Sequence, residues 1–548
     1  MLNSEVENSK SNTSLINSLT PYQGVWTKNE AAHLLRRTLF GPTLSQINRA
    51  VTSGLSQTIT DLLKLYPIDP PLNYEAIDTS VPVGQTWAGK PLPSSQTSKA
   101  HQSRYRSLRT WLVERTIQHD SFSVVEKMAL FWQNHFACDY ISSDTQGGYE
   151  YLMLLRSSCL GNFKQMVKEL TIHPLMLRFL NGNSSTKKHP NENYARELFE
   201  LYTIGKGPQI ANGDYTYYTE HDILEAAKIL TGWRYKNKST ISLPLISSYF
   251  TESRHDNTDK TLSEKFGNTI IKGNNALEYS DLIDVIFKEN QVARFICKKI
   301  YQWFVKAEVN SAIVEGMSQT MIANNYEIVP VIKELLLSEH FYTIENRGTI
   351  IKSPIEFMAS LVKSTNSKIL DLNYSTEDNY RILYTINSSF KNTGMQYFLP
   401  PSVAGWTAYY LEPSFSELWI NSALLLNRFS ISDTVTLYKG YRNYPKNDSR
   451  YKIDILGFLN QISQVADASN AEIVIDQLEL LFCCKPLEIN QRKELKKTLT
   501  DGLPDFEWTA EYNDYIANSN DASYSKPVEK RIKLVLAQLF HMPEFQIQ

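Results

Sequence analysis

Apolar residues recur along most of this chain at the three- and four-residue spacing that buries one face of a helix. The segment TKNEAAHLLRRTLF (27–40) has Thr27 and Glu30 at the separation of a capping box, and Gly41-Pro42 follows its last apolar residue. These start and stop signals predict a helix. The same reasoning predicts further helices at residues 45–65, 101–119, 148–159, 162–180, 192–204, 220–231, 277–306, 311–323, 328–340, 352–365, 414–429, 451–466, 470–482, 490–500 and 527–541.

The most regular pattern lies in SFSVVEKMALFWQNHFACDY (121–140). Ser123 and Glu126 stand at capping-box spacing. One apolar seam then follows, formed by Val125, Ala129, Trp132 and Phe136. Together these signals predict a helix that packs one face against the core.

Strand signals are weak in comparison. Residues 234–275 contain short alternating runs such as STISLPLISSYF, which predict at most a small β-hairpin. Residues 66–100 hold six prolines and many Ser and Thr, as is typical of a long loop. The sequence therefore predicts a mainly α-helical fold, a large multi-helix globule with long ordered loops.

Changes in polarity along the chain predict three parts. Residues 1–24 read as a flexible N-terminal arm, and residues 25–432 as a main helical domain that carries the motifs. A polar joint, DTVTLYKGYRNYPKNDSR, separates this domain from a C-terminal helical subdomain at residues 433–548. We expect the subdomain to pack on the main domain.

Composition places the chain among globular proteins, with 548 residues of which 42% are hydrophobic and 21% charged. Its 56 basic and 58 acidic residues leave a net charge of -2, which gives no global electrostatic footprint for nucleic acid. One stretch is concentrated in basic residues, and we interpret it as a solvated face or as internal partners for carboxylates: Arg104, Arg106, Arg109 and Arg115.

Several function classes lack their signatures. No apolar run approaches the roughly 18 residues that cross a bilayer. The N-terminus lacks the basic and apolar regions of a secretory signal, which predicts a cytoplasmic protein. The five cysteines are scattered and form no Cys-x-x-Cys, so neither a disulfide framework nor a cysteine zinc site is indicated. Zincin, phosphate-loop, nucleophile-elbow and dinucleotide motifs are absent from the sequence.

Candidate chemistry begins with NENYARELFELYTIG (191–205). On a helix, its polar residues fall within one arc of roughly 140°, and they are Glu192, Asn193, Arg196, Glu197 and Glu200. Arg196 is four residues from Glu192 and from Glu200, and such pairs contribute about 0.3–0.5 kcal/mol on a solvated helix. The pattern favours a charged outer face. The alternative is a group of carboxylates arranged for chemistry.

His135 follows Met128 and Phe131 at helical spacing beside the apolar seam, so we expect its imidazole to point inward. One interpretation is a core histidine satisfied by a neighbour. The other is a metal ligand or general base, whose ring Asp139 would orient from one turn later.

Three further positions are candidates. Glu220 begins a helix in which Thr219 and Asp222 form a capping box, and the helix dipole explains Asp222 better than Glu220. SRHDNTDKT (253–261) reads as a loop whose polar residues suit either a site or an inert surface. Trp406, in the proline-rich loop near residue 400, either lines a pocket or plugs the core.

These motifs have a counterpart among known families. AAHLLRRTLFGPT, EKMALFWQNHFA, NENYARELFELYTIG, YTEHDILEAAKILTGW, LPPSVAGW and PEFQIQ occur in the order seen in a large bacterial family catalogued as domain of unknown function 1800. The chain resembles this family from about Ala31 to its last residue. The resemblance implies that relatives are often exported. It also implies a partner, the product of a neighbouring gene that resembles the alkaline-phosphatase and sulfatase superfamily.

The resemblance also marks individual residues. Gln133 stands where the family typically has a second histidine, and positions 133 and 135 lie about 200° apart on a helix, so His135 is the better candidate. Tyr409 and Tyr410 stand near the positions after Gly-Trp where the family has small residues. The positions that match the family's motifs are His33, Arg36, Arg37, Asn134, His135, Asn191, Glu192, Asn193, Arg196, Glu197, Glu200, Glu220, His255, Asp256, Lys260, Pro401, Gly405 and Trp406.

Two hypotheses about function follow. The first is a metal-assisted hydrolase or oxidoreductase with a buried His/Glu site, holding Zn²⁺, Mn²⁺ or Fe²⁺. Its catalytic candidates are Glu197, Glu200, Arg196 and Glu220. Its metal candidates are His135, Glu197 and His255, and other candidates for the site are Asn193, Glu192, Asp256, Lys260 and Trp406. The second hypothesis is a non-catalytic binding or assembly protein, in which the Glu/Arg/Asn cluster is a structural network.

Overall fold

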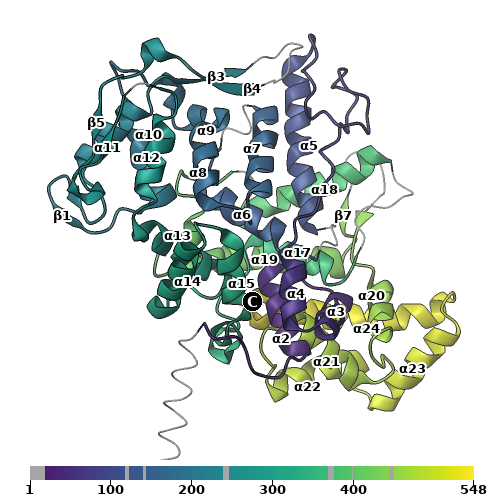
Figure 1. Cartoon of the computed structure of the whole chain (residues 1–548). Helices are drawn as coiled ribbons and strands as arrows, with labels where there is room; N and C mark the ends of the chain where they lie inside the picture. The colour runs from purple at the N-terminus through teal and green to yellow at the C-terminus, as the bar shows by residue number, and fades with distance from the viewer. Residues whose placement is uncertain are drawn as a thin grey trace, which may run out of the picture.

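The computed structural model describes residues 19–117, 122–139, 144–237, 246–273, 275–367, 375–397, 399–442 and 450–548. Helices dominate these residues, and long ordered loops connect them (Figure 1). The predicted mainly α-helical fold is therefore confirmed. Residues 1–18 of the predicted N-terminal arm lie outside the described part of the chain.

Helices occur throughout the described residues. Up to residue 180 they are α2 (Lys28–Thr38), α3 (Leu44–Ser53), α4 (Leu55–Leu62), α5 (Thr97–Ile117), α6 (Val125–His135), α7 (Thr145–Ser157), α8 (Phe163–Thr171) and α9 (Pro174–Phe179). The central helices are α10 (Glu192–Glu197), η3 (Leu198–Thr203), α11 (Glu220–Ile229), α12 (Glu278–Ile286), α13 (Asn290–Phe304), α14 (Ser311–Ala323), α15 (Ile328–Leu337), α16 (Glu339–Tyr342), α17 (Pro354–Lys363) and α18 (Thr376–Asn392). The C-terminal helices are α19 (Ser422–Thr436), α20 (Ile455–Ser463), α21 (Ala471–Phe482), α22 (Ile489–Thr500), α23 (Asp505–Ala517), α24 (Ala522–His541) and α25 (Pro543–Gln546).

Strands form four short antiparallel pairs among the described residues. The pairs are β1 (Gln209–Ala211) with β2 (Asp214–Tyr215), β3 (Trp233–Asn237) with β4 (Ile246–Phe250), β5 (Lys260–Thr261) with β6 (Ile270–Ile271), and β7 (Tyr441–Arg442) with β8 (Arg450–Tyr451). The longest pair, β3–β4, runs from Trp233 opposite Phe250 to Asn237 opposite Ile246. It lies where the alternating pattern at 234–275 predicts a hairpin.

Two of the predicted capping boxes form. Thr27 and Glu30 exchange side-chain and backbone hydrogen bonds at the start of α2, and Thr219 and Asp222 do the same at the start of α11. Both boxes satisfy backbone N–H groups that have no partner inside the helix.

The predicted capping box of α6 is wrong. Val124 is the N-cap and makes no side-chain cap. Ser123 donates instead to the backbone carbonyl of Lys64 at 2.8 Å. Glu126 accepts hydrogen bonds from the Tyr66 hydroxyl and the Arg156 Nε, both at 2.9 Å. Tertiary partners thus replace the local ones.

Some predicted helices are divided. The pattern at 45–65 becomes α3 and α4 because Gly54, with a φ of 77°, ends the first helix. The pattern at 277–306 becomes α12 and α13. The motif helix at 192–204 changes after Glu197 from an α-helix to the wider π-helical turn η3.

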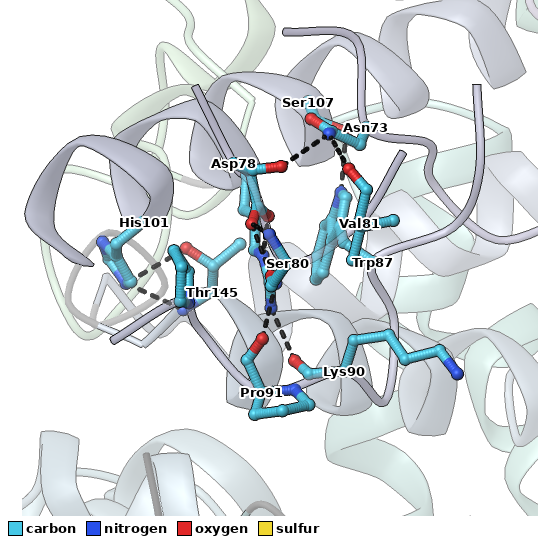
Figure 2. Close-up of polar contacts among 12 residues, drawn as sticks. Asn73, Asp78, Ser80, Val81, Trp87, Lys90, Pro91, His101, Ser107 and Thr145 are labelled. Carbon is cyan, nitrogen blue, oxygen red and sulfur yellow. Dashed lines mark hydrogen bonds and ion pairs between the residues drawn. The ribbon is translucent and has the colours of Figure 1, made fainter. Parts of the chain in front are cut away.

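The predicted long loop at 66–100 is held by Arg104 of α5. Its guanidinium donates to the Asp78 carboxylate and the Lys90 carbonyl, both at 2.6 Å, and to Ser80 at 2.8 Å. Figure 2 shows Asp78 and Ser80 close together beside α5, with Lys90 and Pro91 on the next part of the loop. The side chains of Arg104 and Asp78 are 3% and 0% exposed. The interpretation of this basic stretch as internal partners for carboxylates is confirmed at this position.

Helices from distant parts of the chain lie side by side. α2 packs against α21, and Figure 1 shows both close to α22. The last residues pair with a central segment, where the Gln548 amide donates to the Ile350 carbonyl at 2.9 Å. Residue 433 lies inside α19, and the division into domains stays a prediction. Among the helices of the described residues, none is long and apolar enough to span a membrane.

Candidate functional site

The motif helix α10 begins at an asparagine cap. The Asn191 side chain accepts from the Tyr194 amide at 3.1 Å and donates to the Leu180 carbonyl at 2.7 Å. Tyr194 and Phe199 are buried on the core side. This motif asparagine therefore positions the helix.

The polar arc of this helix faces α11 across a half-buried seam. Arg196 donates from its two Nη atoms to the two carboxylate oxygens of Glu220, each at 2.7 Å. Glu200 lies 3.9 Å from Arg196 and 3.3 Å from Lys206, and it accepts a hydrogen bond from the Tyr218 hydroxyl. The side chains of Arg196 and Glu220 are 29% and 36% exposed. The arc is thus neither a free outer face nor a buried core site.

The carboxylates of this seam have pKa values that are shifted in opposite directions. The hydrogen bonds from Arg196 lower the pKa of Glu220. Burial raises the pKa of Glu197, and the nearby charge of Glu200 raises it further. Glu197 makes no hydrogen bond or ion pair with another described residue.

The remaining residues of the arc, Glu192 and Asn193, are exposed. Glu192 lies on the outer side of α10, so the predicted pair between Glu192 and Arg196 is replaced by the pair with Glu220. The reason is that a bidentate Arg–carboxylate pair between two helices has a better geometry than a pair along one helix.

His135, the last residue of α6, is buried and contacts the motif helix. Its Nε2 lies 3.1 Å from the Tyr202 carbonyl, and its Nδ1 lies 3.2 Å from the Nζ of Lys299 on α13. A carbonyl can only accept, so Nε2 carries the proton and Nδ1 accepts from Lys299. The inward orientation is confirmed. The prediction that Asp139 orients the imidazole is wrong, because Asp139 is exposed. Lys299 contacts the ring at Nδ1 instead.

Burial and charge act together on this pair. Burial lowers the pKa of His135 well below 6.5, and the Lys299 charge lowers it further. Burial also lowers the pKa of Lys299 to about 7. Sequence reasoning missed Lys299, and its position on an apolar helix face offered no signal of a partner.

We expect His135→Gln to reduce the acid sensitivity of folding. Because the pKa of His135 is lowered in the folded state, the unfolded chain binds a proton below pH 6.5 that the folded chain does not bind. As the pH is lowered below 6.5, this residue therefore reduces the free energy of unfolding by up to about 1.4 kcal/mol per pH unit. Urea unfolding at pH 7.5, 6.0 and 5.0 measures the slope. His189→Gln, at an exposed position, is the control. Parallel slopes for wild type and His135→Gln would contradict the prediction.

His255 belongs to a separate, fully buried cluster. Its Nδ1 lies 2.9 Å from the Thr231 carbonyl, and its Nε2 lies 2.8 Å from the Glu278 carboxylate. Lys260 donates to the other Glu278 oxygen at 2.6 Å. The side chains of His255, Lys260 and Glu278 are each at most 1% exposed. The surface-loop alternative for His255 and Lys260 is therefore wrong.

Glu278 is the centre of this cluster, and the motifs did not indicate it. Burial raises the pKa of Glu278, but the hydrogen bonds from His255 and Lys260 outweigh burial and lower it overall. Asp256 stands at the edge, where its carboxylate accepts from the Thr258 amide at 2.9 Å and closes a turn.

Trp406 plugs the core at the end of α6. Its ring is buried, and its backbone N–H donates to the Asn134 side-chain oxygen at 2.9 Å. A Cβ on the preceding Gly405 would lie 2.4 Å from that oxygen, so this close approach requires glycine. The structure thus favours the interpretation in which Trp406 fills the core over the one in which it lines a pocket.

The structure places the predicted metal ligands apart from one another. His135 meets the motif helix at the Tyr202 carbonyl, away from the carboxylates, and His255 lies in its own cluster. Both ring nitrogens of each histidine are engaged by protein groups, which leaves no lone pair for a metal. Among the described residues, no three His, Cys, Asp or Glu side chains form a group that could hold a metal ion. The structure thus does not bring His135, Glu197 and His255 together in one group, and the catalytic and metal roles of these residues stay predictions.

The fold and these contacts define a multi-helix protein whose polar motif residues connect helices to one another. Residues 33–547 match the family described as "Protein of unknown function (DUF1800)", and the chain belongs to this family. The suspected resemblance is therefore confirmed over nearly the whole chain. The comparisons with curated proteins and with solved structures gave no match.

Proposed function

We propose that this chain is a non-catalytic binding or assembly protein, in which the Glu/Arg/Asn cluster is a structural network. The observation that supports this proposal is the use of the motif side chains. Hydrogen bonds to other elements of the same chain engage Asn134, His135, Arg196, Glu220, His255 and Lys260.

The connections join elements that are far apart in sequence. Asn134 holds the loop of Trp406, and His135 holds the π-helical turn at Tyr202. Arg196 and Glu220 join α10 to α11. Such networks fix one arrangement of helices, and a network with every member satisfied stabilises a single packed state.

A specific partner is available for a test of assembly. The family resemblance implies the product of a neighbouring gene, which resembles the alkaline-phosphatase and sulfatase superfamily. We expect the purified full chain to form a complex with it, measured by size-exclusion chromatography with light scattering. Glu197→Gln should keep the complex, because a network needs no ionised Glu197.

The same preparation tests the rival metal enzyme. Zn, Mn and Fe are measured by mass spectrometry in the wild type, in His135→Gln and in the control His189→Gln. The absence of a complex would contradict assembly. Stoichiometric metal that is lost only in His135→Gln would contradict the structural network and favour the metal enzyme.

A second candidate function is a hydrolase with Glu197 as general acid, and one observation favours it. The Glu197 carboxyl is half-buried, has a raised pKa and makes no hydrogen bond with a described residue. A carboxyl in this state holds a proton more readily at neutral pH, as a general acid requires. Ester, phosphate and glycoside substrates would be screened with wild type and Glu197→Gln. Equal rates for both proteins would exclude this role.

A further inference from the structure

A cavity of about 330 Å³ lies between α2, α21 and the start of α22, on the side of the molecule away from the motif helix. Figure 1 shows these three helices close together, below α10 and α11. Four cationic side chains and two carboxylates line the cavity, together with Asn29 and Cys484. The pocket is therefore polar, and its walls include residues of α2, α21 and α22.

Two of the four cations are already paired. Arg347 binds Glu30 at 2.9 Å, outside the cavity wall. Arg492 binds both wall carboxylates, with Asp476 at 2.6 Å and Glu479 as the second partner. These pairs engage both carboxylates of the pocket. Its other two cations therefore have no carboxylate partner.

The first unpaired cation is Arg36, which is 6% exposed. Its Nη2 donates to the Leu480 carbonyl of α21, and its Nε has no hydrogen-bond partner. It forms no ion pair with a carboxylate of the described residues. Burial lowers the pKa of Arg36, and the Arg347 charge lowers it further. The second is Lys485, an exposed residue at the rim with no ion pair to a described carboxylate.

A buried guanidinium without a counter-ion is costly, because few groups replace the water that it loses. An oxyanion in the pocket would supply the missing charge, and the planar fork of arginine suits carboxylate and phosphate alike. The volume lies in the range of pockets for small molecules.

We propose that this pocket binds a small molecule through a carboxylate or phosphate group, which pairs with Arg36 and Lys485. The pocket lies apart from the Glu/Arg/Asn cluster of α10 and α11, although Arg36 is itself a motif position, and the proposal does not depend on the proposed function. Its ligand would bridge α2 and α21, so binding should stabilise the contact between the two ends of the chain.

The test is isothermal titration calorimetry of the full chain with pyrophosphate, citrate and chloride at constant ionic strength. We expect saturable binding of pyrophosphate or citrate and none of chloride. Binding of pyrophosphate alone identifies a phosphate ligand, and binding of citrate alone a carboxylate ligand. The absence of saturable binding for both would overturn the proposal.

Variants locate the binding. Lys485→Gln changes an exposed side chain, and we expect its Kd to rise about fivefold. Lys288→Gln, at another exposed lysine far along the chain, should leave the Kd unchanged. Arg36→Lys keeps the charge but loses the fork, and its Kd should rise more than tenfold if circular dichroism shows that it folds. Equal Kd values for Lys485→Gln and Lys288→Gln would overturn the assignment to this pocket whatever Arg36→Lys does.

Discussion

Replacing Glu278 by glutamine is expected to lower the free energy of unfolding by about 3–5 kcal/mol. Glu278 is the carboxylate partner of Lys260, and both side chains are at most 1% exposed. The variant leaves the Lys260 ammonium buried without a counter-ion, and His255 loses a charged acceptor. Urea unfolding followed by circular dichroism measures the change.

A nearby pair provides the matched control. Lys272 and Asp259 also form a lysine–carboxylate pair, but their side chains are 72% and 49% exposed. Asp259→Asn should therefore leave the free energy of unfolding nearly unchanged, because water screens an exposed pair. The double variant Lys260→Met/Glu278→Gln should recover part of the stability, because no unpaired charge remains. A loss in Glu278→Gln as small as that of Asp259→Asn would contradict this account of the cluster.

The pH dependence of this cluster has a defined sign. The pKa of Glu278 is lowered in the folded state from 4.5. The contribution of this carboxylate to the free energy of unfolding is therefore fully present above pH 4.5, and it is lost as the pH falls through the lowered pKa. Wild type should lose stability more steeply than Glu278→Gln below pH 4.5.

The second large effect is expected at the long loop. Asp78→Asn should lower the free energy of unfolding by about 3 kcal/mol, because Arg104 is then left as a buried, unpaired cation. Arg104 also holds the loop backbone at Lys90 and Pro91, so the loop should open first. Limited proteolysis should produce early cuts within residues 66–100 in the variant and not in wild type.

The control for this prediction is Glu75→Gln in the same loop. Glu75 pairs with Arg106, but these side chains are 17% and 30% exposed. A partly exposed pair is screened by water, so the loss should stay near 1 kcal/mol. Identical cleavage patterns and unfolding curves for Asp78→Asn and Glu75→Gln would refute the role assigned to Arg104.

The helix starts show how far local patterns can be trusted. Thr27 and Glu30 form their capping box as predicted, since both partners lie within one turn. Ser123 and Glu126 have the same spacing, yet Glu126 binds Tyr66 and another helix. Spacing alone cannot tell these cases apart, because the competing partners come from elsewhere in the chain.

The candidate residues show the same division. The apolar seam was sufficient to predict that His135 points inward, and the structure confirms it. Its partner Lys299 is 164 residues away, and no local pattern marks it. Arg196 was expected to pair along its own helix, but its partner with two hydrogen bonds is Glu220.

Helical periodicity over ten to twenty residues thus defined the fold class, most helix positions and the polar residues of the motifs, because these depend on which face of each helix is apolar. Long-range packing settled which polar groups meet. His135 lies against a carbonyl, His255 against Glu278, and Arg36 against no described carboxylate. These outcomes depend on how helices from distant parts of the chain pack together, and the spacing of residues within one segment does not contain that information.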